Sequence, residues 1–213
     1  MSWLALDASG GRAGIAVLAD DGTILHRVFA PLRPGLIETL PLLLQQAVAG
    51  RAIANVAVCT GPGSFTGLRT SIALAQGFSA AAAVPLWGIP ADAGFGVAFP
   101  QLHRQLWTVL RARKGRMFLL REGRAEAVAD EDIPMPRWPI ALAGDAAAAT
   151  AARLAARGAD VLLTNAKMLD PAWIGRAGMA RQALGLPPLP AQPAYIDPPE
   201  AKLPAGGLRP APQ

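Results

Sequence analysis

The sequence predicts an α/β fold built as two lobes, and three observations support this. Short apolar segments alternate with longer helical patterns along the chain, which is typical of strands that alternate with helices. The 213 residues are 52% hydrophobic and 16% charged, so the chain can bury a substantial core. Residues 88–100 are rich in Gly, Pro and Ala and indicate a boundary. We therefore expect an N-terminal lobe over 1–100, a C-terminal lobe over 101–186 and a proline-rich tail over 187–213.

The first lobe is expected to begin with three strands. An apolar segment at 3–6 is followed by an acidic turn and by a second apolar segment at 14–18. An Asp-Asp-Gly turn then leads into a third segment, 23–29. Further along, the short apolar segment 55–60 has the length and composition of a buried strand.

Two helices are expected to flank that buried strand, at 36–48 and 70–78. The first is apolar nearly all round, so two of its sides should be covered. Pro41 lies within it and is expected to start a turn or to kink the helix. The second is rich in small residues, which allow another helix to approach closely. The residues alone leave open whether these helices are buried in the monomer or present a face to a partner.

The second lobe is expected to begin with a hairpin of segments 105–112 and 116–121 around a Lys-Gly turn. Strands and helices then alternate: strand 139–143, helix 145–157, strand 160–164 and helix 171–184. From Pro187 onward prolines crowd the chain, which predicts an extended, partly ordered tail.

The most specific motif is GPGSFTGLR, from Gly61 to Arg69, between the buried strand and the second helix. Its glycines can take positive φ and bring the backbone close to a neighbour. Ser64 or Thr66 can cap the helix that follows. The loop could hold a phosphate on free N–H groups, or it could be a tight turn whose glycines serve packing. It lacks the lysine of a P-loop.

Few residues offer catalytic or metal chemistry. Asp7, on the turn after the first strand, is the one carboxylate placed for it, although a turn aspartate can equally bond local backbone. His26 and His103 lie far apart, and a single cysteine does not complete a metal site, so no metal ligands are assigned. That cysteine, Cys59, is expected to be a small buried hydrophobic residue in a strand.

The chain carries a formal net charge of +5, and its basic residues gather in one run. The members of this run are Arg104, Arg111, Arg113, Lys114, Arg116, Arg121 and Arg124. They could attract nucleic acid or form a solvated hairpin face. No stretch reaches 18 uninterrupted apolar residues, the first apolar run contains Asp7, and the lone cysteine fits a reducing compartment. We therefore expect a cytoplasmic protein without a membrane span.

The order strand, acidic turn, strand, strand, helix, strand, helix is that of an actin/Hsp70-like half-domain. The GPGSFTGLR motif and the small-residue helix after it closely resemble the signature of the TsaB (YeaZ) family. Residues 4–9 resemble the family's opening strand and acidic turn, 40–43 its first long helix, and 193–196 a segment near its C-terminus. The resemblance is strong over 1–90 and patchy beyond. Arg111 is a departure, because the family usually has an acidic residue there.

The resemblance implies a reduced two-lobed actin/Hsp70-like (ASKHA) fold. It also implies a non-catalytic subunit that binds and stabilises TsaD, the enzyme that transfers a threonylcarbamoyl group to the tRNA adenosine next to the anticodon. The two helices would pair with their equivalents in TsaD through Leu36, Leu40, Leu43, Leu44, Leu68, Ile72 and Ala75. The residues nearest to any phosphate or nucleotide would be Asp7, Ser9, Gly61, Gly63 and Ser64.

The resemblance further implies an ATPase partner, TsaE, use of ATP by the complex, and contact with tRNA mainly through the complex. No cofactor is assigned to this chain itself, and a homodimer through the same helical face remains open. Two rival interpretations also remain. A stand-alone nucleotide-dependent ATPase or kinase of the actin-like class would use Asp7, Ser9 and the glycine loop. An RNA-binding module would use Arg111, Arg113 and Arg116.

Overall fold

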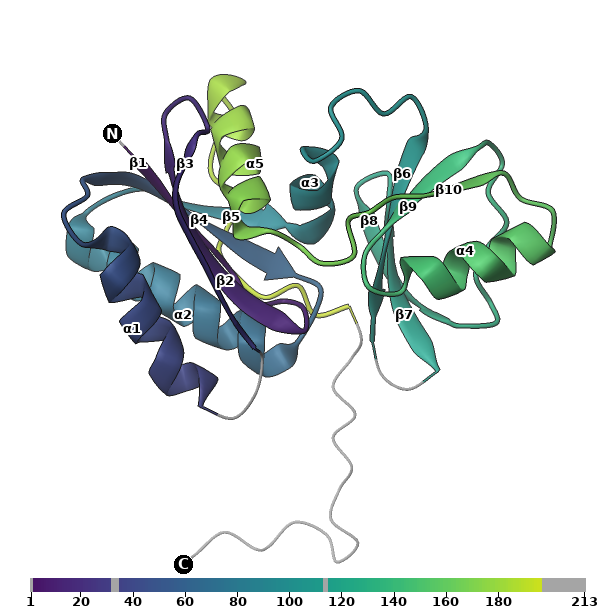
Figure 1. The fold of residues 1–213 in the computed structure, drawn as a ribbon, viewed down its shortest axis with the longest axis horizontal. Coiled ribbons are helices and arrows are strands. Elements are labelled where there is room, and N and C mark those ends of the chain that lie inside the picture. The colour runs from purple at the N-terminus through teal and green to yellow at the C-terminus, as the bar shows by residue number, and fades with distance from the viewer. Residues whose placement is uncertain (1, 32–34, 113–114, 197–213) are drawn as a thin grey trace, which may run out of the picture.

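The computed structural model describes residues 2–31, 35–112 and 115–196, so positions 197–213 of the expected tail lie outside it. The chain forms two lobes, each built on a five-stranded mixed sheet with helices against it (Figure 1). This architecture confirms the two-lobed α/β class expected from the sequence. Within the described ranges, none of the helices has the length and apolar character that crossing a bilayer requires.

The first sheet has the strand order β3-β2-β1-β4-β5. Its strands are β1 (Ser2–Asp7), β2 (Arg12–Ala19), β3 (Ile24–Pro31), β4 (Ile53–Gly61) and β5 (Leu86–Pro90). β1 pairs antiparallel with β2 and parallel with β4, with Leu6 opposite Val58. Because parallel neighbours end at the same edge of a sheet, the turn after β1 and the loop after β4 lie side by side.

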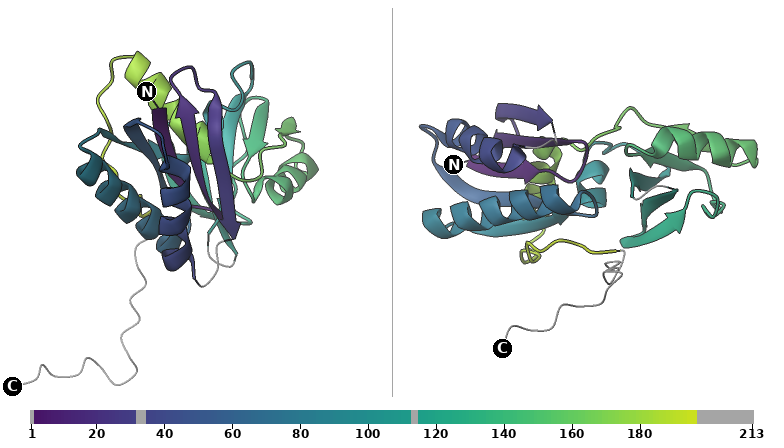
Figure 2. Two further views of the ribbon diagram at one scale, coloured as in Figure 1. Left: turned by 60° about the vertical axis from the view of Figure 1, so that its left-hand side comes forward. Right: turned by 90° about the horizontal axis from the view of Figure 1, so that it is seen from below.

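Helices cover both faces of this sheet (Figures 1 and 2). They are α1 (Leu36–Val48) and α2 (Phe65–Ala82) on one face and α5 (Pro171–Ala183) on the other. Side chains alternate along β1 accordingly: Leu4 and Leu6 join the core under α1 and α2, whereas Trp3 and Ala5 join the core under α5. A strand covered on both faces is apolar along its length, which explains the uninterrupted opening segment.

The second sheet has the strand order β10-β9-β6-β7-β8. Its strands are β6 (Gln105–Arg111), β7 (Arg116–Arg121), β8 (Arg124–Ala129), β9 (Ile140–Ala143) and β10 (Val161–Leu163). One face packs against α4 (Ala147–Ala156), and the other turns towards the first lobe and α3 (Ala91–Gly96). There Leu120 shares a core cluster with Phe95 and Ile89, so the two lobes are joined by buried apolar side chains.

α5 belongs to the first lobe although it follows the second lobe in sequence. It contacts β1, β2 and β4, and two glycines let it approach the sheet closely. A Cβ at Gly175 would lie 2.6 Å from Leu18, and one at Gly178 would lie 2.7 Å from the ring of Trp3. The segment expected in a C-terminal lobe of 101–186 therefore leaves that lobe before α5, because its small residues fit against the first sheet.

Residues 187–196 run back along the first lobe as an extended segment, which we call the strap (Figure 2). The backbone N–H of Gly88 donates to the carbonyl of Leu189 at 2.9 Å, so the strap covers the outer edge of β5. The backbone N–H of Ala194 donates to the carbonyl of Thr60 at 2.8 Å. The strap thus carries the chain to the junction between the lobes.

Candidate functional site

The GPGSFTGLR motif forms the connection between β4 and α2. Gly61 has a φ of 95°, in the left-handed region that favours glycine. Ser64 is the N-cap of α2, and its Oγ accepts a hydrogen bond from the backbone N–H of Gly67 at 3.3 Å. Of the two residues expected to cap this helix, Ser64 is the one that does so.

The motif is pressed against the turn that follows β1. The backbone N–H of Ser64 donates to the carbonyl oxygen of Ser9 at 2.7 Å. A Cβ at Gly63 would lie 2.2 Å from that same oxygen, so a side chain does not fit there. The expected group of Asp7, Ser9, Gly61, Gly63 and Ser64 is therefore brought together where β1 and β4 end.

Asp7 is almost completely buried at the end of β1, with 3% of its surface exposed. Its Oδ1 accepts a hydrogen bond from the backbone N–H of Ser9 at 3.0 Å, which is the local turn contact. Burial raises the pKa of this carboxyl above its ordinary value, although hydrogen bonds from Ser9 oppose the shift. The pKa of the buried Cys59 thiol is raised well above its usual range by burial and by the nearby Asp7 charge.

Ser9, Gly10 and Gly11 form a narrow crevice with the second lobe, where Arg111 and Lys167 lie opposite them. The crevice has a volume of about 30 Å³, which is room for little more than water. Sites for drug-sized ligands are typically about 300 Å³ or larger. The crevice itself is thus too small for a nucleotide.

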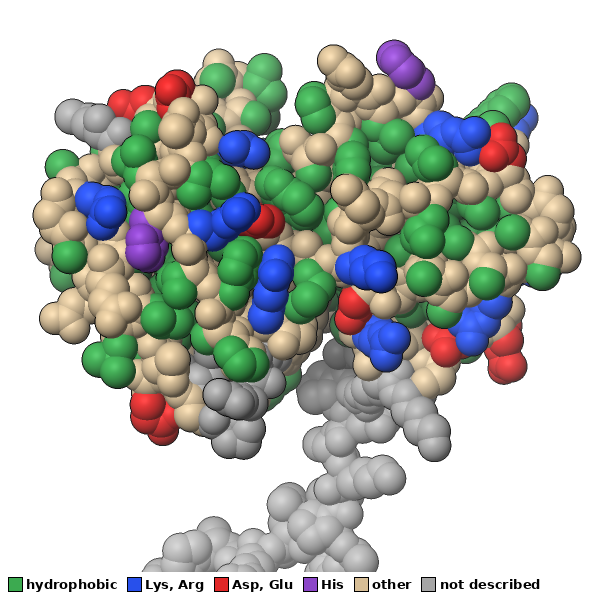
Figure 3. Space-filling model, in the orientation of Figure 1, with side chains coloured by type: hydrophobic (Ala, Val, Ile, Leu, Met, Phe, Trp, Pro, Cys, Tyr) green, Lys and Arg blue, Asp and Glu red, His purple; other side chains and the backbone are tan. Residues whose placement is uncertain are grey.

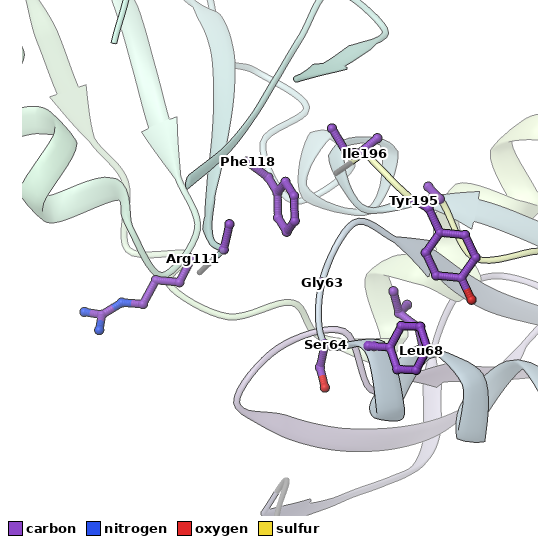
Figure 4. Close-up of a pocket in the computed structure, with 10 residues that line it drawn as sticks. Gly63, Ser64, Leu68, Arg111, Phe118, Tyr195 and Ile196 are labelled. Atoms are coloured by element: carbon purple, nitrogen blue, oxygen red, sulfur yellow. The ribbon is translucent and has the colours of Figure 1, made fainter. Parts of the chain in front are cut away.

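A larger cavity of about 290 Å³ also borders Gly63 (Figure 4). It lies where α2 begins, beside the second sheet and the end of the strap. Phe118 from β7 and Tyr195 from the strap lie around it, while the guanidinium group of Arg111 points away from both rings (Figure 4). Its lining is thus largely apolar and aromatic, and the lining residues come from both lobes and from the strap.

Tyr195 is held to the motif by Arg69. Arg69 Nε donates a hydrogen bond to the Tyr195 hydroxyl at 2.9 Å, and its guanidinium lies 3.9 Å from the centre of the Phe65 ring. The Phe65 and Tyr195 rings are 5.9 Å apart. Sequence reasoning did not single out Phe65, Phe118 or Tyr195. The resemblance of residues 193–196 to a family segment was the available signal.

The residues expected to contact a partner must be corrected, because most of them are buried within this chain. Leu40, Leu44, Leu68, Ile72 and Ala75 are each at most 6% exposed and pack in the core between α1, α2 and the sheet. Side chains that the sheet already covers cannot form an outer contact surface. Leu43 is half-buried, and the side chain of Leu36 lies outside the described residues.

The outer sides of α1 and α2 carry a different set of residues. Leu42 on α1 is 60% exposed. Ala73, Gly77 and Ala80, spaced by four and three residues, share one exposed side of α2. The sequence contains no charged residue from 39 to 50 or from 70 to 83. We call the exposed residues Leu42, Ala73, Gly77 and Ala80 the outer helix face.

Comparisons with known proteins find a matching family model, a curated relative and solved structures of similar fold. A model of the family described as TsaD, tRNA N6-adenosine threonylcarbamoyltransferase, matches residues 36–156, which is more than half of the chain. The tRNA threonylcarbamoyladenosine biosynthesis protein TsaB of Bacillus subtilis is 23% identical over 147 residues. That match covers 65% of this chain and 64% of the relative, so this chain spans less than two thirds of the relative's length.

Solved structures share the fold over nearly the whole chain. YeaZ from Pseudomonas aeruginosa matches with a TM-score of 0.71 and 21% identity, covering 91% of this chain and 99% of that one. A second Pseudomonas aeruginosa structure is of a protein with similarity to peptidase YeaZ. It matches with a TM-score of 0.69 and 21% identity, covering 92% of this chain and 99% of that one. The chain therefore belongs to the family of the matched model, the one described as TsaD, tRNA N6-adenosine threonylcarbamoyltransferase, and it is similar to TsaB in sequence and to YeaZ in fold.

Proposed function

We propose that this chain is a non-catalytic subunit of tRNA threonylcarbamoyladenosine synthesis that binds and stabilises TsaD through the outer helix face. The observation that carries the proposal is the chemistry of that face. Surface helices normally direct charged residues towards solvent, yet two adjacent helices here have uncharged stretches of a dozen residues or more. Apolar and small exposed residues over neighbouring helices are typical of a surface that a partner covers.

The outer helix face is also suited in shape to a helical partner. Ala73, Gly77 and Ala80 carry at most a methyl group, so a second helix can approach the α2 backbone closely. α1 lies beside α2 on the same face of the sheet, and Leu42 adds a large apolar side chain (Figure 1). A pair of helices from TsaD laid across them would complete a four-helix bundle.

Other partners follow from the same proposal. TsaE would dock on the pair and the complex would consume ATP, while this chain alone would have no transferase activity. tRNA would reach the chain mainly as part of the complex. Without TsaD, a second copy of this chain would pair through the same face, and TsaD would compete with that homodimer.

The test is to mix the purified chain with TsaD from the same organism and to measure the mass of the product by size-exclusion chromatography with light scattering. We expect a stable heterodimer. Ala73→Glu and Leu42→Glu should weaken it at least a hundredfold, since each places a charge in an apolar interface. Ala155→Glu, an equally exposed alanine on α4 in the second lobe, should bind as the unmodified chain does.

Melting temperatures of all variants establish that each is folded. Absence of a heterodimer under any nucleotide condition would overturn the proposed function. Undiminished binding by both Glu variants would leave a TsaD complex but move its surface away from the outer helix face.

A further inference from the structure

Another concave surface lies in the second lobe and is lined by arginines. It is a pocket of about 390 Å³ between the hairpin of β6 and β7 and the side of α4. Arg111 at the end of β6, Arg116 at the start of β7 and Arg153 on α4 line it, together with Asp130. Several basic side chains lie over this lobe in Figure 3. We call this cavity the arginine pocket.

Positive charge exceeds negative charge in the arginine pocket. Asp130 is the one carboxylate among its described lining residues, and it lies 3.5 Å from Arg153 in an ion pair. Arg116 Nη2 donates to the carbonyl of Ala127 at 3.0 Å. The guanidinium of Arg111 makes no hydrogen bond or ion pair with the described residues.

Two arginines nearer the ends of the same basic run form ion pairs with carboxylates. Arg104 contacts Asp160 at 2.6 Å, and Arg121 contacts Glu126 at 3.0 Å. Arg111, from the middle of the run, lies instead in the arginine pocket, next to Arg153 of α4, which the sequence pattern did not indicate. Arg113 and Lys114, also in the run, lie outside the described residues.

The shape and residues of the pocket fit phosphate groups. Guanidinium groups bind phosphate oxygens through pairs of parallel N–H bonds, and three of them border one cavity here. The remaining described lining residues are small or apolar: Ala112, Gly115, Met117, Ala146 and Ala149. They leave the arginines accessible from the cavity.

We propose that the arginine pocket binds the phosphate backbone of RNA. None of its described lining residues is aromatic, so it offers no ring on which a base could stack. A site built from guanidinium groups alone positions a polynucleotide through its backbone without reading its sequence. The choice of tRNA as the RNA rests on the proposed function, whereas the pocket itself rests on its arginines.

The test measures binding of an unmodified transcript of a tRNA that reads A-starting codons, over a series of salt concentrations. It uses the full chain alone and the chain bound to TsaD. The double variant Arg111→Gln/Arg153→Gln should bind about a hundredfold more weakly, or tenfold per arginine. The slope of log affinity against log salt should become shallower by about two, one for each lost phosphate contact. Arg137 is an exposed arginine of the same lobe that lies outside the pocket. Arg137→Gln should lower the RNA affinity only slightly and leave the salt slope nearly unchanged.

Inorganic pyrophosphate and ATP serve as further probes by calorimetry. Arginine-dependent binding of these anions with unchanged tRNA binding would overturn the RNA proposal in favour of a small-anion site. Equal affinities and slopes for the double variant and the unmodified chain would overturn it entirely. Arginine-dependent RNA binding by a chain that forms no TsaD complex would leave the pocket standing and refute the proposed function instead.

Discussion

Gly63 and the carbonyl oxygen of Ser9 are in direct apposition, with room for a hydrogen atom but not for a methyl group on the glycine. The neighbouring hydrogen bond from Ser64 to the same oxygen fixes this approach. The contact joins the turn after β1 to the family motif. In this chain the glycine thus has a packing role, because it lets two loops meet.

Gly63→Ala should destabilise the protein by about 2–3 kcal/mol, because its Cβ would lie 2.2 Å from a backbone oxygen that cannot move without shifting β1 or β4. Gly77→Ala is the matched control. Its Cβ would meet nothing within 4 Å, and replacing a helical glycine should stabilise α2 by about 0.5–1 kcal/mol. Urea unfolding of both variants measures the difference. Equal stabilities would mean that the Gly63 backbone is not held against Ser9.

Leu40→Ala and Leu42→Ala test which side of α1 faces the core. Leu40 is buried to 1% exposure, so its truncation should cost about 2–5 kcal/mol through lost burial and a cavity. Leu42 lies on the outer helix face, and its truncation should change the free energy of unfolding by less than about 0.5 kcal/mol. Chemical denaturation of the isolated chain measures both. If truncation cost more at Leu42 than at Leu40, the side of α1 that carries Leu42 would be the one packed in the core.

These two leucines also show where sequence reasoning reaches its limit. The apolar pattern predicted the helix at 36–48, and α1 has those bounds, continuing through Pro41. The same pattern could not tell its inner from its outer side, because leucines occupy both. Only the placement of the sheet makes Leu40 a core residue and Leu42 a surface residue, and this is why most of the expected contact residues are buried.

Three elements escaped prediction for local reasons. β5 contains Gly88 and Pro90, which are typical of turns, yet pairing with β4 and the strap makes it a strand. α3 spans six residues, too few for a helical period. β8 is rich in Ala and charged residues, and its pairing with β7 overrides that weak propensity.

The sequence indicated which residues lie together near the end of β1 more successfully than it indicated which residues face outward on the helices. Asp7, Ser9 and the glycine loop were expected near a common site, and the adjacent ends of β1 and β4 bring them together. The contribution of Tyr195 could not be foreseen from pattern alone. It depends on the strap returning across more than a hundred residues to reach Arg69.

The raised pKa of Asp7 predicts a pH dependence of stability. Its carboxyl holds a proton to higher pH in the folded chain than in the unfolded chain, where the pKa is about 4. Between the two pKa values the folded state binds more protons, so this group's contribution to stability falls as pH rises through that window. Asp7→Asn cannot ionise, while its side-chain oxygen can still accept the hydrogen bond from Ser9.

The stability of Asp7→Asn relative to the unmodified chain should therefore rise as pH increases above about 4 and level off above the folded-state pKa. Urea unfolding across pH 3–8 gives this difference directly. Burial also raises the pKa of Asp92. Because Asp92 is present in both proteins, its contribution cancels in the difference between their stabilities. A difference that stays constant with pH would refute a buried, desolvated Asp7.

Gly88→Ala should detach the strap from β5. A Cβ at this position would lie 2.2 Å from the carbonyl oxygen of Pro190, and the bridge between Gly88 and Leu189 would have to open. The amide of Ala194, which donates to Thr60, should then exchange with solvent about tenfold faster, because the strap's open state becomes more populated. Hydrogen exchange over residues 187–196 measures this. Gly96→Ala, where a Cβ meets nothing within 4 Å, should leave the exchange rate unchanged. If both variants exchange alike, the strap is anchored by contacts other than its pairing with β5, and the hydrogen bond from Arg69 to Tyr195 would be the next to remove.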